Sequence, residues 1–298
     1  MSPDRLEHRE SSGLVIVDKP GGVTSHDVVA RVRRLAGTRK VGHAGTLDPM
    51  ATGVLVLGLN RATRLLGHLM LTEKKYDATI RLGASTTTDD AEGDVVATAP
   101  TDHLTEEEIL TGLSQFVGDI EQVPSSVSAI KVDGRRAYDR VRAGEQVELK
   151  PRRVSVASIE VHDIVGADVC VSVQCSSGTY IRAIARDLGE RLGTGGHLTA
   201  LRRTAVGAFD VASAHTLDEL ESSFTFLPIA EAARVSFPVR DLDEELTADV
   251  RVGRKLALDL GLDGPVALFA PDGEFLALYA RDGEIARAVA VFAPDSRQ

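Results

Sequence analysis

The chain has 298 residues, of which 43% are apolar, so it can bury a sizeable core in one large domain or in one large and one small domain. Its only cysteines, Cys170 and Cys175, provide neither a disulfide framework nor a zinc knuckle, which indicates reduced thiols in a cytosolic, cytoplasmic protein. The N-terminal residues are polar and no apolar run reaches the roughly 18 residues of a membrane span, so we expect neither a signal peptide nor a membrane segment.

The net charge of −10 argues against a nucleic-acid partner until it is divided along the chain. Residues 1–72 carry 10 basic and 6 acidic side chains (+4), and residues 131–206 carry 13 and 9 (+4). Residues 73–130 carry 3 and 12 (−9), and residues 207–298 carry 8 and 17 (−9). One interpretation is ordinary variation of surface charge. The other is a local basic groove on an acidic protein, because binding to a polyanion depends on local contacts.

The first half of the chain alternates strands with helices. A short strand at 13–20 precedes a helix with Thr24 or Ser25 as N-cap and Gly37 just past its end. A buried strand at 53–60 and a short helix at 61–70 follow. Residues 74–83 then alternate as in a half-buried strand, with Tyr76 on its apolar face.

A helix with a capping box from Thr105 to Glu108 follows, and then a strand, an Asp-Gly turn and a basic helix at 125–144. Residues 152–175 form a strand pair around Gly166, on which Cys170 and Cys175 point to opposite faces.

Beyond residue 175, a loop opens into a helix that ends near Gly193. An acidic linker at 236–246 leads to a region of glycine turns and short apolar strands. The pattern lacks the regular rhythm of a doubly wound sheet, so we predict an α+β protein with a mixed, mostly antiparallel sheet flanked by helices.

Residues 42–49, GHAGTLDP, form the most constrained stretch of the chain. Gly42 and Gly45 allow close approach of another group, and Pro49 keeps Asp48 out of the helical region. A lone Asp-Pro more often caps a turn. Here the adjacent His43 and the apolar run that follows favour an active-site carboxylate acting as nucleophile, base or electrostatic stabiliser.

Five segments in order resemble the TruB family of tRNA pseudouridine synthases, over about residues 13–210. They are VDKPGGVTSHDVV, KVGHAGTLDPMATGVLVLGLNRATR, KKYDATIRLGASTTTDDAEG, VPSSVSAIKVDGRRAYDRVRAGEQVE and CSSGTYIRAIARDLGERLGTGGHLTALRRTAVG. The resemblance implies the pseudouridine-synthase fold, a catalytic domain at 1–238 with an RNA-binding insertion at about 124–150, and a small β-rich, PUA-like domain at 239–298. The acidity of residues 207–298 is a departure that puts strong RNA binding by the last domain in doubt.

The resemblance also implies roles for individual residues. Asp48 attacks the target uridine, Tyr76 stacks on the flipped base and acts in proton transfer, and Arg182 pairs with Asp48 and keeps it ionised. It further implies that Tyr180 and Leu201 line the uracil pocket, that His43 fills the gap left by the flipped nucleotide, and that Lys19 contacts the RNA or the motif backbone. The residues implied in RNA binding are Lys131, Arg135, Arg136, Arg202 and Arg203.

The segment TTTDDAEGD is a further cluster of possible ligands. Its acids Asp89, Asp90, Glu92 and Asp94 resemble a loose Ca²⁺ or Mg²⁺ loop but lack the spacing of a calcium-binding loop, so we interpret it as a solvated turn. The isomerisation consumes nothing, so we expect no cofactor and no metal.

The sequence therefore predicts a stand-alone, monomeric enzyme that converts the T-loop uridine 55 of tRNA to pseudouridine, without an obligate protein partner. The attack by Asp48 is compatible with a covalent C1′ adduct and with a glycal-type intermediate. The alternative from another class is an RNA-binding, tRNA-folding chaperone with catalysis secondary. Guide-RNA-dependent relatives are a rival within the family, disfavoured by the chain's own insertion, and a carboxylate hydrolase would need a second acid that no motif offers.

Overall fold

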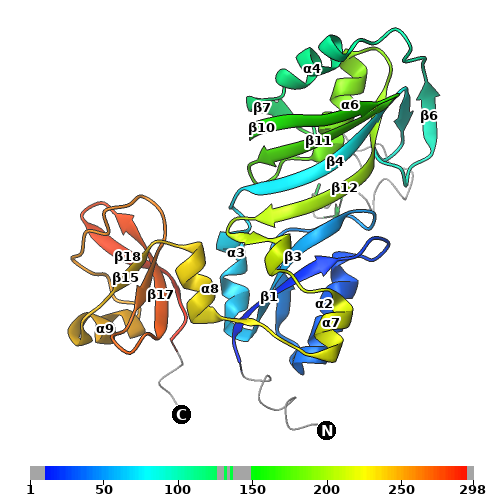
Figure 1. Cartoon of the computed structure of the whole chain (residues 1–298). Coiled ribbons are helices and arrows are strands. Elements are labelled where there is room, and N and C mark those ends of the chain that lie inside the picture. Colours follow the sequence, from blue (N-terminus) through cyan, green and yellow to red (C-terminus); the bar gives the residue numbers. More distant parts are fainter. Residues whose placement is uncertain (1–10, 126–130, 133–134, 137–148, 294–298) are drawn as a thin grey trace.

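The computed structural model describes residues 11–125, 131–132, 135–136 and 149–293. Its centre is a large mixed sheet in the order β14-β1-β3-β12-β4-β11-β10-β7, with β2 paired to β3 and β13 to β12 (Figure 1). The strands are β1 (Gly13–Lys19), β2 (Val41–His43), β3 (Thr52–Leu59), β4 (Lys74–Leu82), β7 (Gly118–Gln122), β10 (Arg152–Val165), β11 (Asp168–Cys175), β12 (Gly196–Val206), β13 (Phe209–Asp210) and β14 (Leu227–Pro228). Within the described ranges, all of its pairs are antiparallel except β12 with β3.

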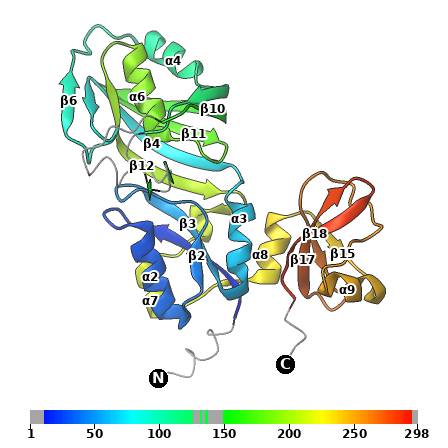
Figure 2. The same ribbon diagram turned by 180° about the vertical axis from the view of Figure 1, so that it is seen from behind.

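The two halves of the sheet differ in how they are covered. β1 and β3 are buried along almost their whole length. Helices α2 and α7 cover one face, and α3, α8 and part of a second sheet cover the other (Figures 1 and 2). In β4, by contrast, buried and more exposed residues alternate, with the apolar face turned toward α6. The helices are α2 (Ser25–Ala36), α3 (Leu66–Leu69), α4 (Glu106–Ser114), α6 (Ile181–Arg191), α7 (Leu217–Ser222), α8 (Ile229–Ser236) and α9 (Glu244–Arg251), with 3₁₀ turns η1 (Asn60–Arg64) and η2 (Val211–Ser213).

Local sequence signals set the helix ends. Thr24 is the N-cap of α2 and forms a capping box with Asp27, and Gly37 ends the helix in the left-handed conformation at φ 64°. The predicted capping box of Thr105 with Glu108 is present at the start of α4. Both predictions are confirmed, because capping uses only neighbouring residues.

A second, four-stranded sheet follows α8 (Figures 1 and 2). Its strands are β15 (Val239–Asp241), β16 (Val266–Phe269), β17 (Phe275–Asp282) and β18 (Ile285–Val291). Arg61 and Arg64 of η1 each donate a hydrogen bond of 2.7 Å to a carbonyl near its end, at Phe292 and Val291. The guanidinium of Arg234 also lies over the Phe269 ring, 3.8 Å from its centroid. The two sheets are therefore joined by polar and apolar contacts, and the division at residue 239 stays a prediction.

Smaller β elements complete the described chain. β5 (Ala84–Thr86) pairs with β6 (Val95–Thr98), and β8 (Lys131–Val132) pairs with β9 (Arg135–Arg136). The other residues between 126 and 148, including the predicted basic helix, lie outside the described residues. On β11, Cys175 is buried and Cys170 is only partly so, as their predicted opposite orientations require. Of the helices that are described, none combines the length and the apolar character that crossing a bilayer would need.

Candidate active site

Asp48 lies in the loop between β2 and β3, and three elements hold the backbone of this loop. Ser25 at the start of α2 accepts a hydrogen bond from the Leu47 amide and donates one to the Leu47 carbonyl, both at 2.9 Å. Lys19 at the end of β1 donates to the Pro49 carbonyl at 3.2 Å. Arg203 of β12 donates to the Gly45 carbonyl at 3.1 Å. The peptides on both sides of Asp48 are thus fixed before a substrate binds.

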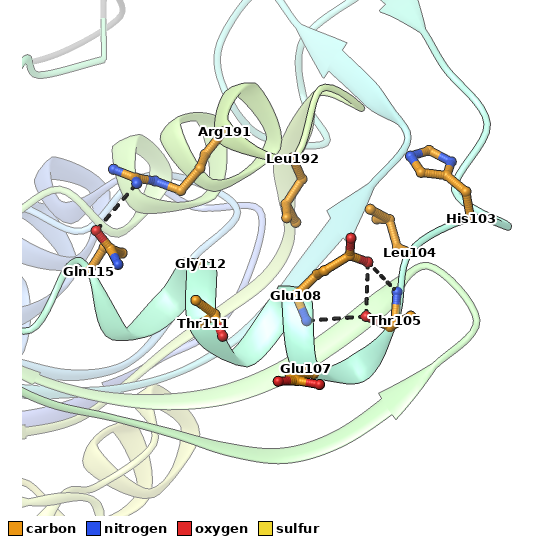
Figure 3. A pocket seen from close by; sticks show the side chains of 10 residues that line it. All are labelled: His103, Leu104, Thr105, Glu107, Glu108, Thr111, Gly112, Gln115, Arg191 and Leu192. Atoms are coloured by element: carbon orange, nitrogen blue, oxygen red, sulfur yellow. Dashed lines mark hydrogen bonds between the residues drawn. The ribbon is translucent and has the colours of Figure 1, made fainter.

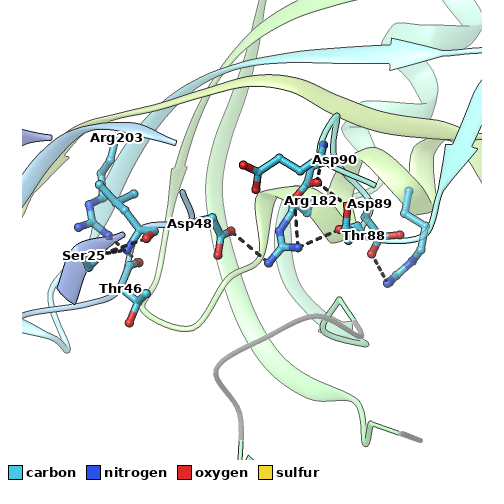
Figure 4. Close-up of polar contacts among 11 residues, drawn as sticks. Ser25, Thr46, Asp48, Thr88, Asp89, Asp90, Arg182 and Arg203 are labelled. Atoms are coloured by element: carbon cyan, nitrogen blue, oxygen red, sulfur yellow. Dashed lines mark hydrogen bonds and ion pairs between the residues drawn. The ribbon is translucent and has the colours of Figure 1, made fainter. Parts of the chain in front are cut away.

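A buried arginine faces the Asp48 carboxylate (Figure 4). Nη2 of Arg182 lies 3.1 Å from Oδ2 of Asp48, and Nη1 lies 3.3 Å from Oδ2 of Asp90. Nη1 also donates to the Thr88 carbonyl at 2.8 Å. The side chain of Arg182 is 5% exposed and that of Asp90 3%, whereas that of Asp48 is 37% exposed. One carboxylate is therefore buried behind the arginine while the other remains accessible.

Burial and two neighbouring charges act on the pKa of Asp48 in opposite directions. Burial raises it and is the largest effect, the positive charge of Arg182 lowers it, and the negative charge of Asp90 raises it again. The balance is a pKa above the usual aspartate value. Arg182 thus favours the ionised form as predicted, but it does not fully offset burial.

Asp48 opens into a cavity of about 260 Å³. Tyr76 lies in its wall, 8% exposed, and burial raises the pKa of its hydroxyl. The described lining residues are Gly45, Thr46, Leu47, Asp48, Met70, Lys74, Tyr76, Ser177, Gly178, Thr179, Tyr180, Ile181, Arg182, Leu201 and Arg203. The structure thus brings together Asp48, Tyr76, Arg182, Tyr180 and Leu201, which the sequence placed in one site.

Tyr180 is held by a side chain that the sequence analysis missed. Gln122, at the end of β7 and 2% exposed, accepts a hydrogen bond from the Tyr180 amide at 2.8 Å and donates one to its carbonyl at 3.0 Å. Tyr180 is the N-cap of α6, the helix that carries Arg182. A glutamine at a strand end has no distinctive sequence signal, because its partner is 58 residues away.

Two lysines near the site are buried. Nζ of Lys19 donates to the carbonyls of Pro20, Val23 and Pro49, so of the two predicted contacts the structure shows the one with the motif backbone. Lys19 is 0% exposed, which does not fit direct contact with RNA. Nζ of Lys74 donates to the Met70 and Thr72 carbonyls. Burial lowers the pKa of each lysine to about 8.

The lowered pKa of Lys74 predicts a stability difference at alkaline pH. Between about pH 8 and its usual pKa of 10.5, the unfolded chain keeps a proton that the folded protein has lost, so the free energy of unfolding rises with pH. We expect wild type to gain about 2 kcal/mol over Lys74→Met between pH 8 and 9.5. Urea unfolding across this range measures the gain. Lys75→Met, on the exposed side of the same strand, should show none, and parallel curves for wild type and Lys74→Met would contradict the prediction.

The other residues predicted to contact RNA differ in burial and in their partners. Arg203 is 1% exposed, so RNA binding by it is wrong for this structure: its guanidinium is used by backbone carbonyls. Arg202 points to the other side of β12, where it pairs with Asp18 at 2.7 Å and is 40% exposed. His43 is half-buried and packs edge-on against His26, with ring centroids 5.8 Å apart, outside the described cavity lining. The side chains of Lys131, Arg135 and Arg136 are outside the described structure.

The interpretation of the acidic segment as a solvated turn is wrong for Asp89 and Asp90, whereas Glu92 and Asp94 are exposed as predicted. Asp90 is buried against Arg182, and Asp89 lies 3.2 Å from Nη1 of Arg186. Among the residues the structure describes, no group of three or more acidic, histidine or cysteine side chains is arranged for a metal ion. Nothing in the sequence signalled the burial of Asp90, because its partner Arg182 is far along the chain.

A larger hollow, of about 600 Å³, lies between α4 and α6 (Figure 3). Its polar side chains are exposed, and Glu108 there is used in the capping box with Thr105. This hollow lacks a buried ion pair like that of Asp48 with Arg182. We therefore assign the chemistry to the Asp48 cavity.

Comparison with known proteins agrees with this architecture. Residues 33–181 match the family model described as TruB family pseudouridylate synthase (N terminal domain), and residues 182–235 match the tRNA pseudouridylate synthase B C-terminal domain. Residues 237–293 match the model described as tRNA Pseudouridine synthase II, C terminal. The chain therefore belongs to the TruB family of pseudouridylate synthases.

Relatives and solved structures extend the comparison to the whole chain. The chain is 56% identical to the tRNA pseudouridine synthase B of Arthrobacter sp. (strain FB24), over 96% of this chain and 98% of that one. It is 58% identical to that of Thermobifida fusca (strain YX), over 95% and 99%. A Cbf5-Nop10-Gar1 complex gives a TM-score of 0.73 at 28% identity, covering 98% of this chain and 88% of the other. An H/ACA RNP bound to a substrate RNA gives 0.73 at 27%, covering 99% and 89%. The predicted α+β pseudouridine-synthase fold is confirmed.

Proposed function

We propose that this protein is a tRNA pseudouridine synthase that isomerises uridine 55 in the T loop. The observation that carries the proposal is the accessible Asp48 carboxylate, paired with buried Arg182 at 3.1 Å in a cavity that Tyr76 also lines. The high identity to the tRNA pseudouridine synthase B of Arthrobacter sp. (strain FB24) and of Thermobifida fusca (strain YX), over nearly the whole chain, supports the substrate.

The cavity suits one base that has left the RNA stack. Its volume of about 260 Å³ is close to the lower end of ligand pockets, roughly 300 Å³. An enzyme that acts on a glycosidic bond must extrude the nucleotide to reach it. Tyr76 then stacks on the flipped uracil, Tyr180 and Leu201 line its pocket, and His43 supports the RNA where the base has left.

In the reaction, Asp48 attacks the flipped uridine and the C1′–N1 bond breaks, giving either a covalent C1′ adduct or a glycal-type intermediate. The uracil rotates and C5 bonds to C1′, and Asp48 is returned as the free carboxylate. C5 loses its proton and N1 gains one, so the product is an isomer of the substrate. Arg182 aims the Asp48 carboxylate and favours its ionised form. Because substrate and product are isomers, the reaction needs no oxidant or reductant, and we propose that it needs no cofactor.

Recognition of the T arm is proposed for basic residues of the sheet surface and of the insertion. Single-stranded loops present unstacked bases that a protein can read, and phosphate contacts fix the register. Arg202 at the sheet surface and Lys131, Arg135 and Arg136 in the insertion would supply such contacts. We further propose that the enzyme works as a cytoplasmic monomer without a protein partner, since it carries its own insertion; gel filtration of the active protein tests this.

The experiment that tests the function uses an unmodified tRNA transcript. We expect the purified protein alone to form pseudouridine at position 55, mapped at single-nucleotide resolution, and to form none in a transcript with cytidine at that position. Tight binding without product would overturn the enzymatic proposal in favour of a tRNA-folding chaperone. Product at another uridine would overturn the substrate assignment.

A further inference from the structure

Arg203 and Tyr76 face each other across two strands of the sheet. They are direct partners in the antiparallel pairing of β12 with β4. Residues opposite each other in such a pair project from the same face and lie close enough for their side chains to interact. Both side chains line the Asp48 cavity. The register of the sheet therefore brings this arginine to the site.

The Arg203 guanidinium joins the two sides of the Asp48 loop. Nε donates to the Val54 carbonyl at 2.7 Å, after the loop, and Nη2 and Nη1 approach the carbonyls of Gly45 and Thr46, before it, at 3.1 and 3.4 Å. Guanidinium is planar, so these donors have fixed relative directions. Figure 4 shows the loop with Arg203 on one side and Arg182 on the other.

The same guanidinium acts on the Tyr76 hydroxyl. Arg203 lowers the pKa of Tyr76 through its charge and through a hydrogen bond, against the larger raising effect of burial. Because guanidinium only donates, the phenolic oxygen is the acceptor in this contact.

Retaining a cation at this position is costly for the fold. Among the described residues, no carboxylate lies within ion-pair distance of Arg203, which is 1% exposed. A buried charge without an opposite charge is unfavourable, even when carbonyls accept its hydrogen bonds.

We propose that Arg203 is a positioning residue, which sets the Asp48 loop and the Tyr76 hydroxyl in one fixed geometry. The inference rests on the proposed function, since it assigns Arg203 a role in the same reaction. It differs from the roles of the neighbouring arginines: Arg182 contacts the Asp48 carboxylate itself, and Arg202 lies on the opposite side of β12.

The test is a double-mutant cycle of four proteins. These are wild type, Arg203→Lys, Tyr76→Phe and the double variant. Lysine keeps the charge but cannot reach several carbonyls and a hydroxyl at once. We expect the single-turnover rate of Arg203→Lys to fall about 10- to 100-fold with the dissociation constant for tRNA unchanged. In the Tyr76→Phe background the same change should cost clearly less, because part of its effect acts through the hydroxyl.

Arg81→Lys serves as the matched comparison. Arg81 on β4 forms a surface ion pair with Asp168 on β11, so this variant should change neither the single-turnover rate nor the dissociation constant for tRNA. Weaker binding with a normal saturated rate in Arg203→Lys would overturn the proposal, as would independent, multiplicative effects of Arg203→Lys and Tyr76→Phe. If wild type itself forms no pseudouridine, the proposed function fails instead.

A second measurement covers the case in which Arg203→Lys does not fold. Arg182 and Arg203 are the buried arginines among the described residues, so their side-chain Nε–H signals should exchange slowest in ¹⁵N NMR. Arg182→Lys removes one signal and thereby identifies the other as Arg203. We expect Tyr76→Phe to shift the Arg203 signal, and an unchanged signal would overturn the contact.

Discussion

Asp48→Asn is expected to lower pseudouridine formation by at least about four orders of magnitude, because the amide cannot act as the nucleophile. Binding of tRNA should persist, since asparagine has nearly the same shape and removes a negative charge that repels phosphate. Single-turnover assays and filter binding on the same protein separate the two quantities. Asp102→Asn, at an exposed position, is the matched control and should behave as wild type.

The same substitution has an expected effect on stability. Because the pKa of Asp48 is raised in the folded protein, ionisation costs folding free energy as the pH rises through the usual aspartate range to the raised value, and the cost is complete above it. Asp48→Asn removes this cost, so its melting temperature at pH 7 should equal or exceed that of wild type. An active Asp48→Asn would disprove the assigned role, and an inactive but strongly destabilised one would leave the stability argument contradicted.

Arg182→Lys is expected to lower the rate at saturating tRNA about 10²- to 10³-fold. Arg182 contacts Asp48 and Asp90 with separate nitrogens, 3.1 and 3.3 Å away, and a lysine ammonium cannot reproduce this fork. Loss of one preorganised electrostatic donor at a reaction centre typically lowers the rate about 10²- to 10³-fold. Affinity for tRNA should stay within about threefold, because the arginine is 5% exposed.

The pH dependence separates an electrostatic effect from misfolding. In wild type the charge of Arg182 lowers the pKa of Asp48, against burial and Asp90. In Arg182→Met this opposing effect is absent, so the acidic limb of the rate profile should move to higher pH. Arg191→Lys, on the exposed side of the same helix, should leave rate and profile unchanged. A profile for Arg182→Met that coincides with wild type would contradict the assignment.

Local features of this chain were predictable because their causes are local. The Thr24–Asp27 and Thr105–Glu108 caps use residues three positions apart, and the alternation along β4 places Tyr76 on the buried side whatever the strand pairs with. Asp48 was identifiable as a candidate from the glycines and proline around it. The class of fold followed from the succession of elements and the family resemblance.

The errors concern residues whose roles depend on distant partners. Arg202 and Arg203 are adjacent basic residues with the same local signal, yet one is paired at the surface with Asp18 and the other is buried beneath the Asp48 loop. Asp90 belongs to a segment that resembles a solvated turn until α6 brings Arg182 to it. Gln122 gave no signal before its contact with Tyr180 was seen.

Residue type and short spacing were enough to predict the helix caps, the strand faces, the constrained Asp48 turn and the family. Which charges are buried together depends instead on how the whole chain folds. Asp48, Asp90, Arg182 and Arg203 lie on segments up to 155 positions apart, and strand register and helix packing bring them into one cavity wall or directly behind it. Burial then changes what each charge can do, because a low-dielectric surrounding strengthens the pairs and shifts the pKa of Asp48.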